Sequence, residues 1–94
     1  MRIRWLRRAL LDLIQLRRYI ADNNPAAAAD TANRIIHSVE SLIDHPALGR
    51  YGRGEGTREL VVSGLPYIIP YRIKNKGIEI LRVMHTSMKW PDEL

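Results

Sequence analysis

Apolar residues recur at intervals of three and four positions near the start of the chain, the spacing that lines one side of an α-helix. This spacing predicts a helix over residues 6–22. Its apolar face consists of Leu6, Ala9, Leu10, Leu13, Leu16 and Ile20. The remaining surface carries Arg7, Arg8, Gln15, Arg18 and Tyr19, with Leu11 as the large apolar residue left among them. The helix is therefore expected to have a basic outer face.

A second helix is expected to follow almost at once. Asn24 suits the capping position, and Pro25 suits the first helical position, where its missing N–H breaks no hydrogen bond. The apolar pattern extends to Asp44, and Pro46 prevents the helix from continuing. The stripe comprises Ala28, Ala32, Ile35, Val39 and Leu42, flanked by Ala29, Ile36 and Ile43. Because only a few polar residues separate the helices, they are expected to form an antiparallel hairpin.

The second half of the chain changes to the alternation of β-strands. Residues 49–56 are rich in glycine and are expected to form a loop. Strand-like runs follow over residues 57–63, 67–74 and 78–85, and residues 1–5 are expected to add a short strand. The expected fold class is α+β: an N-terminal short strand, an antiparallel helical hairpin and a three-stranded antiparallel meander. We expect a single domain over residues 1–94.

The middle strand of the meander has two distinct faces. Successive side chains of a strand point to opposite sides, and the first face is expected to lie against the helices. It carries Tyr67, Ile69, Tyr71 and Ile73. Pro70 lies on the other face and cannot donate to the ladder, so we expect a bulge or an unpaired position there.

The amino-acid composition limits the partners and cofactors that can be expected. The net charge is +5, and twelve of the fifteen basic residues are arginine, the side chain best suited to bidentate contact with phosphate or carboxylate. An anionic partner is therefore expected. There is no cysteine, and His37, His45 and His85 form no metal-ligand pattern, so neither a metal site nor a cofactor is expected. No signal peptide or membrane span is predicted, which favours a cytoplasmic protein.

The candidate chemistry is a set of basic and aromatic residues on the sheet and at its ends. It comprises Arg50, Arg53, Arg58, Arg72, Arg82, His85, Lys89 and Trp90, which are expected to bind a target. Together with Glu59, part of this set could also cleave RNA, with a carboxylate or His85 moving protons and arginines stabilising the transition state. Alternatively, Arg72 and Arg82 cover apolar surface or pair with Glu59 or Glu79.

The whole pattern resembles the RelE/ParE superfamily of bacterial toxin-antitoxin toxins, and within it the ParE branch. The first half contributes Ala9, Asp12-Leu13, Tyr19-Ile20, Asn24-Pro25, Ala28, Leu42, Pro46 and Gly49-Arg50. The second half contributes residues 56–60, Tyr67-Ile68-Ile69, Tyr71-Arg72-Ile73, Val83, His85 and Trp90-Pro91. The resemblance implies a toxin that a co-expressed antitoxin holds silent. ParE-like members inhibit DNA gyrase, whereas RelE-like members are ribosome-dependent mRNA endonucleases on the same scaffold.

The details favour the gyrase inhibitor over the enzyme. The RNase branch usually places a basic residue before the first aromatic of the middle strand, where this chain has Leu65-Pro66-Tyr67. His85 is followed by Thr86 rather than by a catalytic tyrosine. If the chain were nevertheless an RNase, its catalytic residues would be Glu59, Arg72, Arg82 and His85. A non-toxic basic module that binds nucleic acid is a third interpretation, and it predicts a steep salt dependence of binding.

Two contact surfaces are expected under the favoured interpretation. The basic face of the sheet and the tail over residues 84–94 would engage the topoisomerase complex and trap cleaved DNA without covalent work by the toxin. The partner would be a ParD-like antitoxin whose acidic C-terminal segment folds across the helical hairpin and forms a hetero-oligomer. Its expected contacts are Arg7, Arg8, Leu11 and Arg18.

Overall fold

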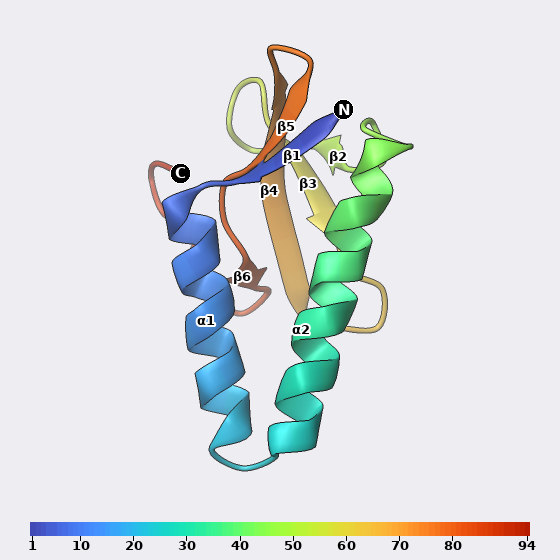
Figure 1. The fold of residues 1–94 in the computed structure, drawn as a ribbon. Coiled ribbons are helices and arrows are strands. Elements are labelled where there is room, and N and C mark those ends of the chain that lie inside the picture. The colour runs from blue at the N-terminus through green and yellow to red at the C-terminus, as the bar shows by residue number, and fades with distance from the viewer.

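A computed structural model describes all 94 residues as two layers, in which a helical hairpin lies against one face of a sheet (Figure 1). The expected α+β class is confirmed. The first half holds strand β1 (Arg2–Trp5), helices α1 (Arg7–Ala21) and α2 (Pro25–Glu40), and a 3₁₀ turn, η1 (Ser41–Ile43). The second half holds strands β2 (Arg50–Tyr51), β3 (Arg58–Val61), β4 (Tyr67–Lys74), β5 (Gly77–Ile80) and β6 (Met84–His85).

Both helices form where the apolar periodicity places them. The Asn24 side chain accepts a hydrogen bond from the Ala27 N–H at 3.1 Å, and Pro25 occupies the first turn, so the predicted cap of α2 is confirmed. The helix ends at Glu40 and continues as the η1 turn, which stops before Pro46. The two helices are antiparallel neighbours, as their short connection requires (Figure 1).

The sheet has the strand order β1-β5-β4-β3-β2. The expected meander is confirmed, because β3, β4 and β5 pair antiparallel, and β1 adds to the edge in parallel with β5. The loop predicted over residues 49–56 is partly wrong. Within it, Arg50 and Tyr51 form strand β2, opposite Glu59 and Arg58 of β3.

The run predicted over residues 78–85 is interrupted at Leu81–Val83, which corrects the expectation of one continuous strand. The Leu81 N–H donates to the Pro70 carbonyl at 2.9 Å, and the proline has no N–H to return. The chain then turns away, and β6 resumes pairing farther along β4, with Met84 opposite Ile68. The unpaired position expected at Pro70 is therefore the point where β4 changes partner.

The core lies between the helices and the first face of β4. Tyr67, Ile69 and Tyr71 pack there with Ile35 and Val39 of α2. Ile73 was expected on this face but is 43% exposed, because it lies beyond the hydrophobic core cluster. On the opposite face Ile68 and Pro70 are also buried, as are Leu81 and Met84 of the interrupted segment. The sheet therefore buries part of both faces.

Candidate functional site

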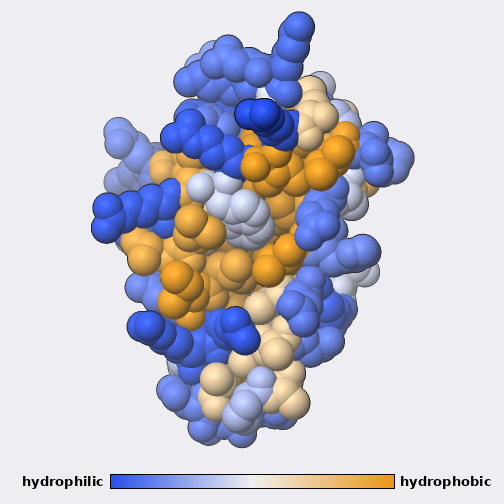
Figure 2. Space-filling view, viewed as in Figure 1, coloured by the Kyte–Doolittle hydropathy of each residue, from blue (hydrophilic) through white to orange (hydrophobic).

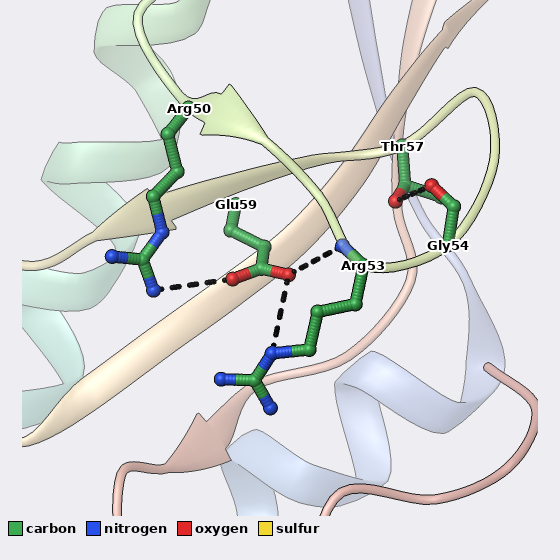
Figure 3. A network of polar contacts seen from close by, with 5 residues as sticks. All are labelled: Arg50, Arg53, Gly54, Thr57 and Glu59. Atoms are coloured by element: carbon green, nitrogen blue, oxygen red, sulfur yellow. Dashed lines mark hydrogen bonds and ion pairs between the residues drawn. The ribbon is translucent and has the colours of Figure 1, made fainter.

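Glu59 is the centre of a polar network on the face of the sheet that points away from the helices. Glu59 is only 2% exposed. The Arg50 guanidinium donates to one carboxylate oxygen at 3.2 Å, and the Arg53 backbone N–H donates to the other at 2.9 Å. The Arg53 side chain lies 4.0 Å from that second oxygen (Figure 3). Glu59 is thus bound by two arginines, as a buried carboxylate requires.

The loop between β2 and β3 presents Arg53 to this carboxylate. Gly52 donates its N–H to the Thr57 carbonyl at 2.9 Å. The Thr57 hydroxyl donates to the Gly54 carbonyl at 2.6 Å (Figure 3). The loop is therefore closed by its own hydrogen bonds. The Arg53 guanidinium also stacks 4.0 Å above the Trp90 ring, and this cation–π contact joins the loop to the C-terminal tail.

Glu79 on β5 is a second carboxylate held between arginines. Arg72 donates to it at 2.6 Å, and Arg4 donates at 3.4 Å. The hydrogen bond from Arg72 lowers the pKa of Glu79 most, against a smaller opposing effect of burial. The alternative interpretation in which Arg72 pairs with Glu79 is confirmed. The Arg72 side chain nevertheless remains 40% exposed.

Arg82 is placed differently from the other predicted target contacts. It is 5% exposed and donates to both carboxylate oxygens of Asp12 on α1, at 2.7 and 3.1 Å. The same carboxylate accepts the Val83 N–H at 3.0 Å, which helps to draw this segment away from β4. Arg82 is therefore not available to a target, and it pairs with neither Glu59 nor Glu79. The sequence shows no signal for this contact, because Asp12 lies 70 positions away.

Three other predicted residues lie on β3, on β6 and in the C-terminal tail. Arg58 donates to the Gly49 carbonyl at 2.7 Å and lies 4.7 Å above the Tyr51 ring, so it holds the strand β2 segment in place. His85 is exposed, with its ring 5.4 Å from that of Tyr67. Lys89 is exposed and forms no ion pair.

The four residues that an RNase would require do not converge. Glu59 lies opposite Pro70, so it shares the outer face of the sheet with Arg72. His85 contacts Tyr67, which faces the helices. Arg82 reaches α1 on that same side. The predicted set is therefore divided between the two faces of the sheet.

The outer face nevertheless keeps a positive charge. We define the sheet surface as this face together with residues 89–94 of the tail. Its ion pairs join Arg4, Arg50, Arg53 and Arg72 to Glu59 and Glu79. The four arginines and two glutamates of these pairs leave two positive charges, and Lys89, Asp92 and Glu93 of the tail reduce the sum to one. Trp90 lies beside Arg53, so an aromatic side chain adjoins this charge.

A second basic region lies on the helices. We define the hairpin surface as the exposed apolar residues Leu10, Leu11, Ile14 and Ile43 with the arginines Arg7, Arg8, Arg17 and Arg18. Figure 2 shows apolar side chains gathered between α1 and α2 and bordered by hydrophilic ones. None of these four arginines forms an ion pair. The predicted contacts Arg7, Arg8, Leu11 and Arg18 thus belong to one surface.

The sequence pattern missed part of the hairpin surface. Leu10 was assigned to the buried stripe, but it is 45% exposed, and Ile14 is 46% exposed. Both lie on the side of α1 that the sheet does not cover. Their exposure corrects the expectation that Leu11 alone is stranded among polar residues.

No group of three or more histidine and acidic side chains is placed to hold a metal ion. Neither helix has the length and apolar character that crossing a bilayer demands.

Comparison with known proteins gives consistent results. Residues 3–90 match the family model described as the ParE toxin of type II toxin-antitoxin system, parDE. The chain is 50% identical over 93 residues to the protein Y4kP of Sinorhizobium fredii, covering 99% of this chain and 96% of that one. It is 37% identical over 83 residues to toxin RelE2 of Caulobacter vibrioides, covering 88% of this chain and 92% of the relative.

Two solved structures share the fold. A chain of the chromosomal ParDE system from P. aeruginosa superposes with a TM-score of 0.83 at 28% identity, covering 90% of this chain and 95% of that chain. A chain of the toxin-antitoxin complex RelBE2 from Mycobacterium tuberculosis gives a TM-score of 0.60 at 26% identity, covering 89% and 95%. The resemblance found in the sequence is confirmed.

Proposed function

Because this chain belongs to the ParE toxin family of type II toxin-antitoxin systems, we propose that it poisons DNA gyrase and is neutralised by an antitoxin bound to its helical hairpin. The choice of gyrase over mRNA as the target rests on where the four candidate RNase residues lie. Glu59 and Arg72 lie on one face of the sheet, and Arg82 and His85 lie on the other. The groups that would transfer protons and stabilise charge during RNA cleavage therefore cannot all contact one scissile bond.

The sheet surface supports a binding mechanism rather than a covalent one. Arg50, Arg53 and Arg72 keep exposed fractions of 57%, 56% and 40% beyond their glutamate contacts. Lys89 and Trp90 extend this surface along the tail. In this proposal these groups contact the gyrase–DNA complex and stabilise its cleaved state, while gyrase itself performs the chemistry.

Expression of the chain in bacteria tests the choice of target. The proposal predicts a DNA-damage response and loss of chromosome supercoiling, with cellular mRNA left intact. Rapid arrest of translation with supercoiling unchanged would refute gyrase as the target. A Lys89→Glu/Trp90→Ala variant should lose toxicity, whereas Lys76→Glu, on the turn between β4 and β5, should keep it.

A RelE-like, ribosome-dependent mRNA endonuclease is the second candidate function. Its support is that toxin RelE2 is a relative and that His85 is exposed. This candidate predicts mRNA cleavage in a translation extract and its loss in His85→Ala. Intact mRNA at toxin concentrations that stop supercoiling would exclude it.

The hairpin surface supports the antitoxin part of the proposal. Its exposed apolar residues suit the apolar side of an amphipathic segment, and its unpaired arginines suit acidic residues on that segment. Arg7→Glu/Arg8→Glu/Arg18→Glu should weaken antitoxin binding at least tenfold, measured by calorimetry with the purified antitoxin. The same reversal of Lys74 and Lys76 serves as the control. Unchanged affinity in the arginine variant would place the antitoxin elsewhere.

A further inference from the structure

The last six residues of the chain, 89–94, lie beside the outer face of the sheet with few specific contacts. None of them forms a hydrogen bond or an ion pair with the rest of the chain. Trp90 stacks on Arg53 and is half-buried, as is Pro91, whereas Asp92 and Glu93 are exposed. The end of the tail can therefore leave the sheet without breaking any hydrogen bond.

A recess of about 350 Å³ lies between the tail and the sheet. Residues 90–94 of the tail line one side, and the other side includes Arg53, Thr57, Arg72 and Leu81. The side chains of Arg53 and Arg72 remain 56% and 40% exposed beyond their glutamate contacts. Two accessible guanidinium groups therefore share one recess with the end of the tail.

Asp92 and Glu93 bring negative charge into this recess. They reduce the charge of the sheet surface from three positive charges to one. Neither carboxylate forms an ion pair with an arginine. Their attraction to Arg53 and Arg72 therefore acts through solvent, where it is weak and screened by salt. A stronger polyanion can replace them.

The arginines of the outer face form a band that crosses the whole sheet. Arg4, Glu79 and Arg72 lie in register on β1, β5 and β4, and Arg50 and Glu59 lie in register on β2 and β3. Neighbouring strands are about 4.8 Å apart, so the band from β1 to β2 is about 19 Å wide. One acidic side chain requires one arginine, whereas DNA presents phosphates at regular short intervals. The band therefore suits a DNA backbone.

We propose that Arg53 and Arg72 bind DNA phosphates, and that the acidic end of the tail occupies their recess until DNA displaces it. This inference rests on the proposed function and deepens it, because it assigns the recess to the DNA of the gyrase–DNA complex. It also divides the tail into two parts. Residues 89–90 extend the surface that attracts the target, whereas residues 92–93 compete with the target.

The first test measures binding of the purified chain to a short fluorescein-labelled DNA duplex by anisotropy, without gyrase. Asp92→Asn/Glu93→Gln should bind about fivefold more tightly, because two competing carboxylates are lost. Asp22→Asn/Asp30→Asn removes the same charge from the helical layer and should change the affinity by less than about twofold, because salt screens distant charges. No binding to the duplex, unchanged affinity in the tail variant, or an equal gain in the control would each overturn the proposal.

The second test asks whether the tail acts through the recess. Arg72→Gln should weaken duplex binding about fivefold and reduce its salt dependence by about one phosphate contact. Arg17→Gln, on the hairpin surface, should keep the affinity of the unaltered chain. Adding Asp92→Asn/Glu93→Gln to Arg72→Gln should tighten binding less than it does in the unaltered chain. Equal gains in the two backgrounds would show that the carboxylates do not compete for this recess.

The displacement itself is measured by NMR relaxation of the ¹⁵N-labelled chain. The heteronuclear NOE of residues 92–94 should fall when the duplex is bound, although the complex tumbles more slowly. An unchanged NOE would show that the tail stays in place and would overturn the proposal. Tighter binding of hexaglutamate than of the duplex would assign the recess to an acidic protein segment instead. Because gyrase is absent from these assays, a chain that leaves gyrase active would contradict only the proposed function.

Discussion

The sheet surface and the hairpin surface are both rich in arginine, but they use it in different ways. On the sheet, Glu59 and Glu79 each hold two arginines, and Arg53 also stacks on Trp90. On α1, four arginines have no acidic partner at all. Counting arginines therefore does not show which surface is ready for a partner. The distribution of the acidic residues shows this, because it determines which arginines are already paired within the chain.

The position of the free arginines on α1 strengthens this contrast. The first turn of the helix carries no acidic residue, and Arg7 and Arg8 lie there instead. Cations are unfavourable at the positive end of the helix dipole. Residues that are unfavourable in their local setting, with no partner in the chain to offset this, are expected where another molecule binds. The sheet arginines, in contrast, stabilise the fold and the tail even without a partner.

The largest effect is expected from breaking the most internal arginine contact. Asp12→Asn keeps the shape of the side chain but leaves the charge of Arg82 buried and uncompensated. The free energy of unfolding should fall by about 3 kcal/mol in denaturant titrations. Asp30→Asn, an exposed site on α2, should change it by less than about 0.5 kcal/mol. Similar small losses in both variants would show that the Asp12–Arg82 pair does not hold the segment after β5.

A smaller loss is expected from the network around Glu59. Glu59→Gln weakens the contacts to Arg50 and Arg53 and should cost about 2 kcal/mol of unfolding free energy. Because Arg53 stacks on Trp90, the tail should also become more mobile, which Trp90 fluorescence reports in a Trp5→Phe background. The exposed Glu55→Gln is the control. Unchanged Trp90 fluorescence would mean that Glu59 does not position the tail.

Neutralising the free arginines should have almost no effect on stability. Arg7→Gln/Arg18→Gln removes no ion pair, so the free energy of unfolding should change by less than about 0.5 kcal/mol. Denaturant titration of the variant without antitoxin measures this. A loss as large as that of Glu59→Gln would remove the distinction between the two surfaces.

The smallest effect is a pH dependence at the edge of the sheet. The pKa of Glu79 is lowered in the folded state, chiefly by Arg72, so its contribution to stability is present above the unfolded pKa. That contribution is lost as the pH falls through the folded pKa. Glu79→Gln should therefore weaken the fall in the free energy of unfolding at acidic pH, which is the acid limb of the stability curve. Glu40→Gln, whose side chain forms no ion pair, should leave the limb unchanged.

Local patterns predicted most of the fold. The apolar periodicity located both helices, Asn24 and Pro25 marked the start of α2, and alternation with short turns predicted the meander. Residues 78–85 were expected to be continuous because their pattern alone contains no reason for a break. The reason is the absent N–H of Pro70 on β4, together with the carboxylate of Asp12 on α1.

The candidate site was less predictable than the fold. The sequence singled out Arg82 and Glu59 but could not show that each is bound internally, because their partners come from other elements. Periodicity also placed Leu10 on the buried stripe, since it cannot tell which edge of a helix a second layer leaves open. Side-chain pairing between distant elements is a property of the folded chain.

The most direct test of the account measures two variants in the same pair of assays. Arg7→Glu/Arg18→Glu on the hairpin surface should lose antitoxin binding and keep the ability to inhibit supercoiling by purified gyrase. Lys89→Glu/Trp90→Ala on the sheet surface should keep antitoxin binding and lose gyrase inhibition. If both folded variants lost the same activity, or if the unaltered chain left gyrase fully active, the assignment of separate roles to the two surfaces would be contradicted.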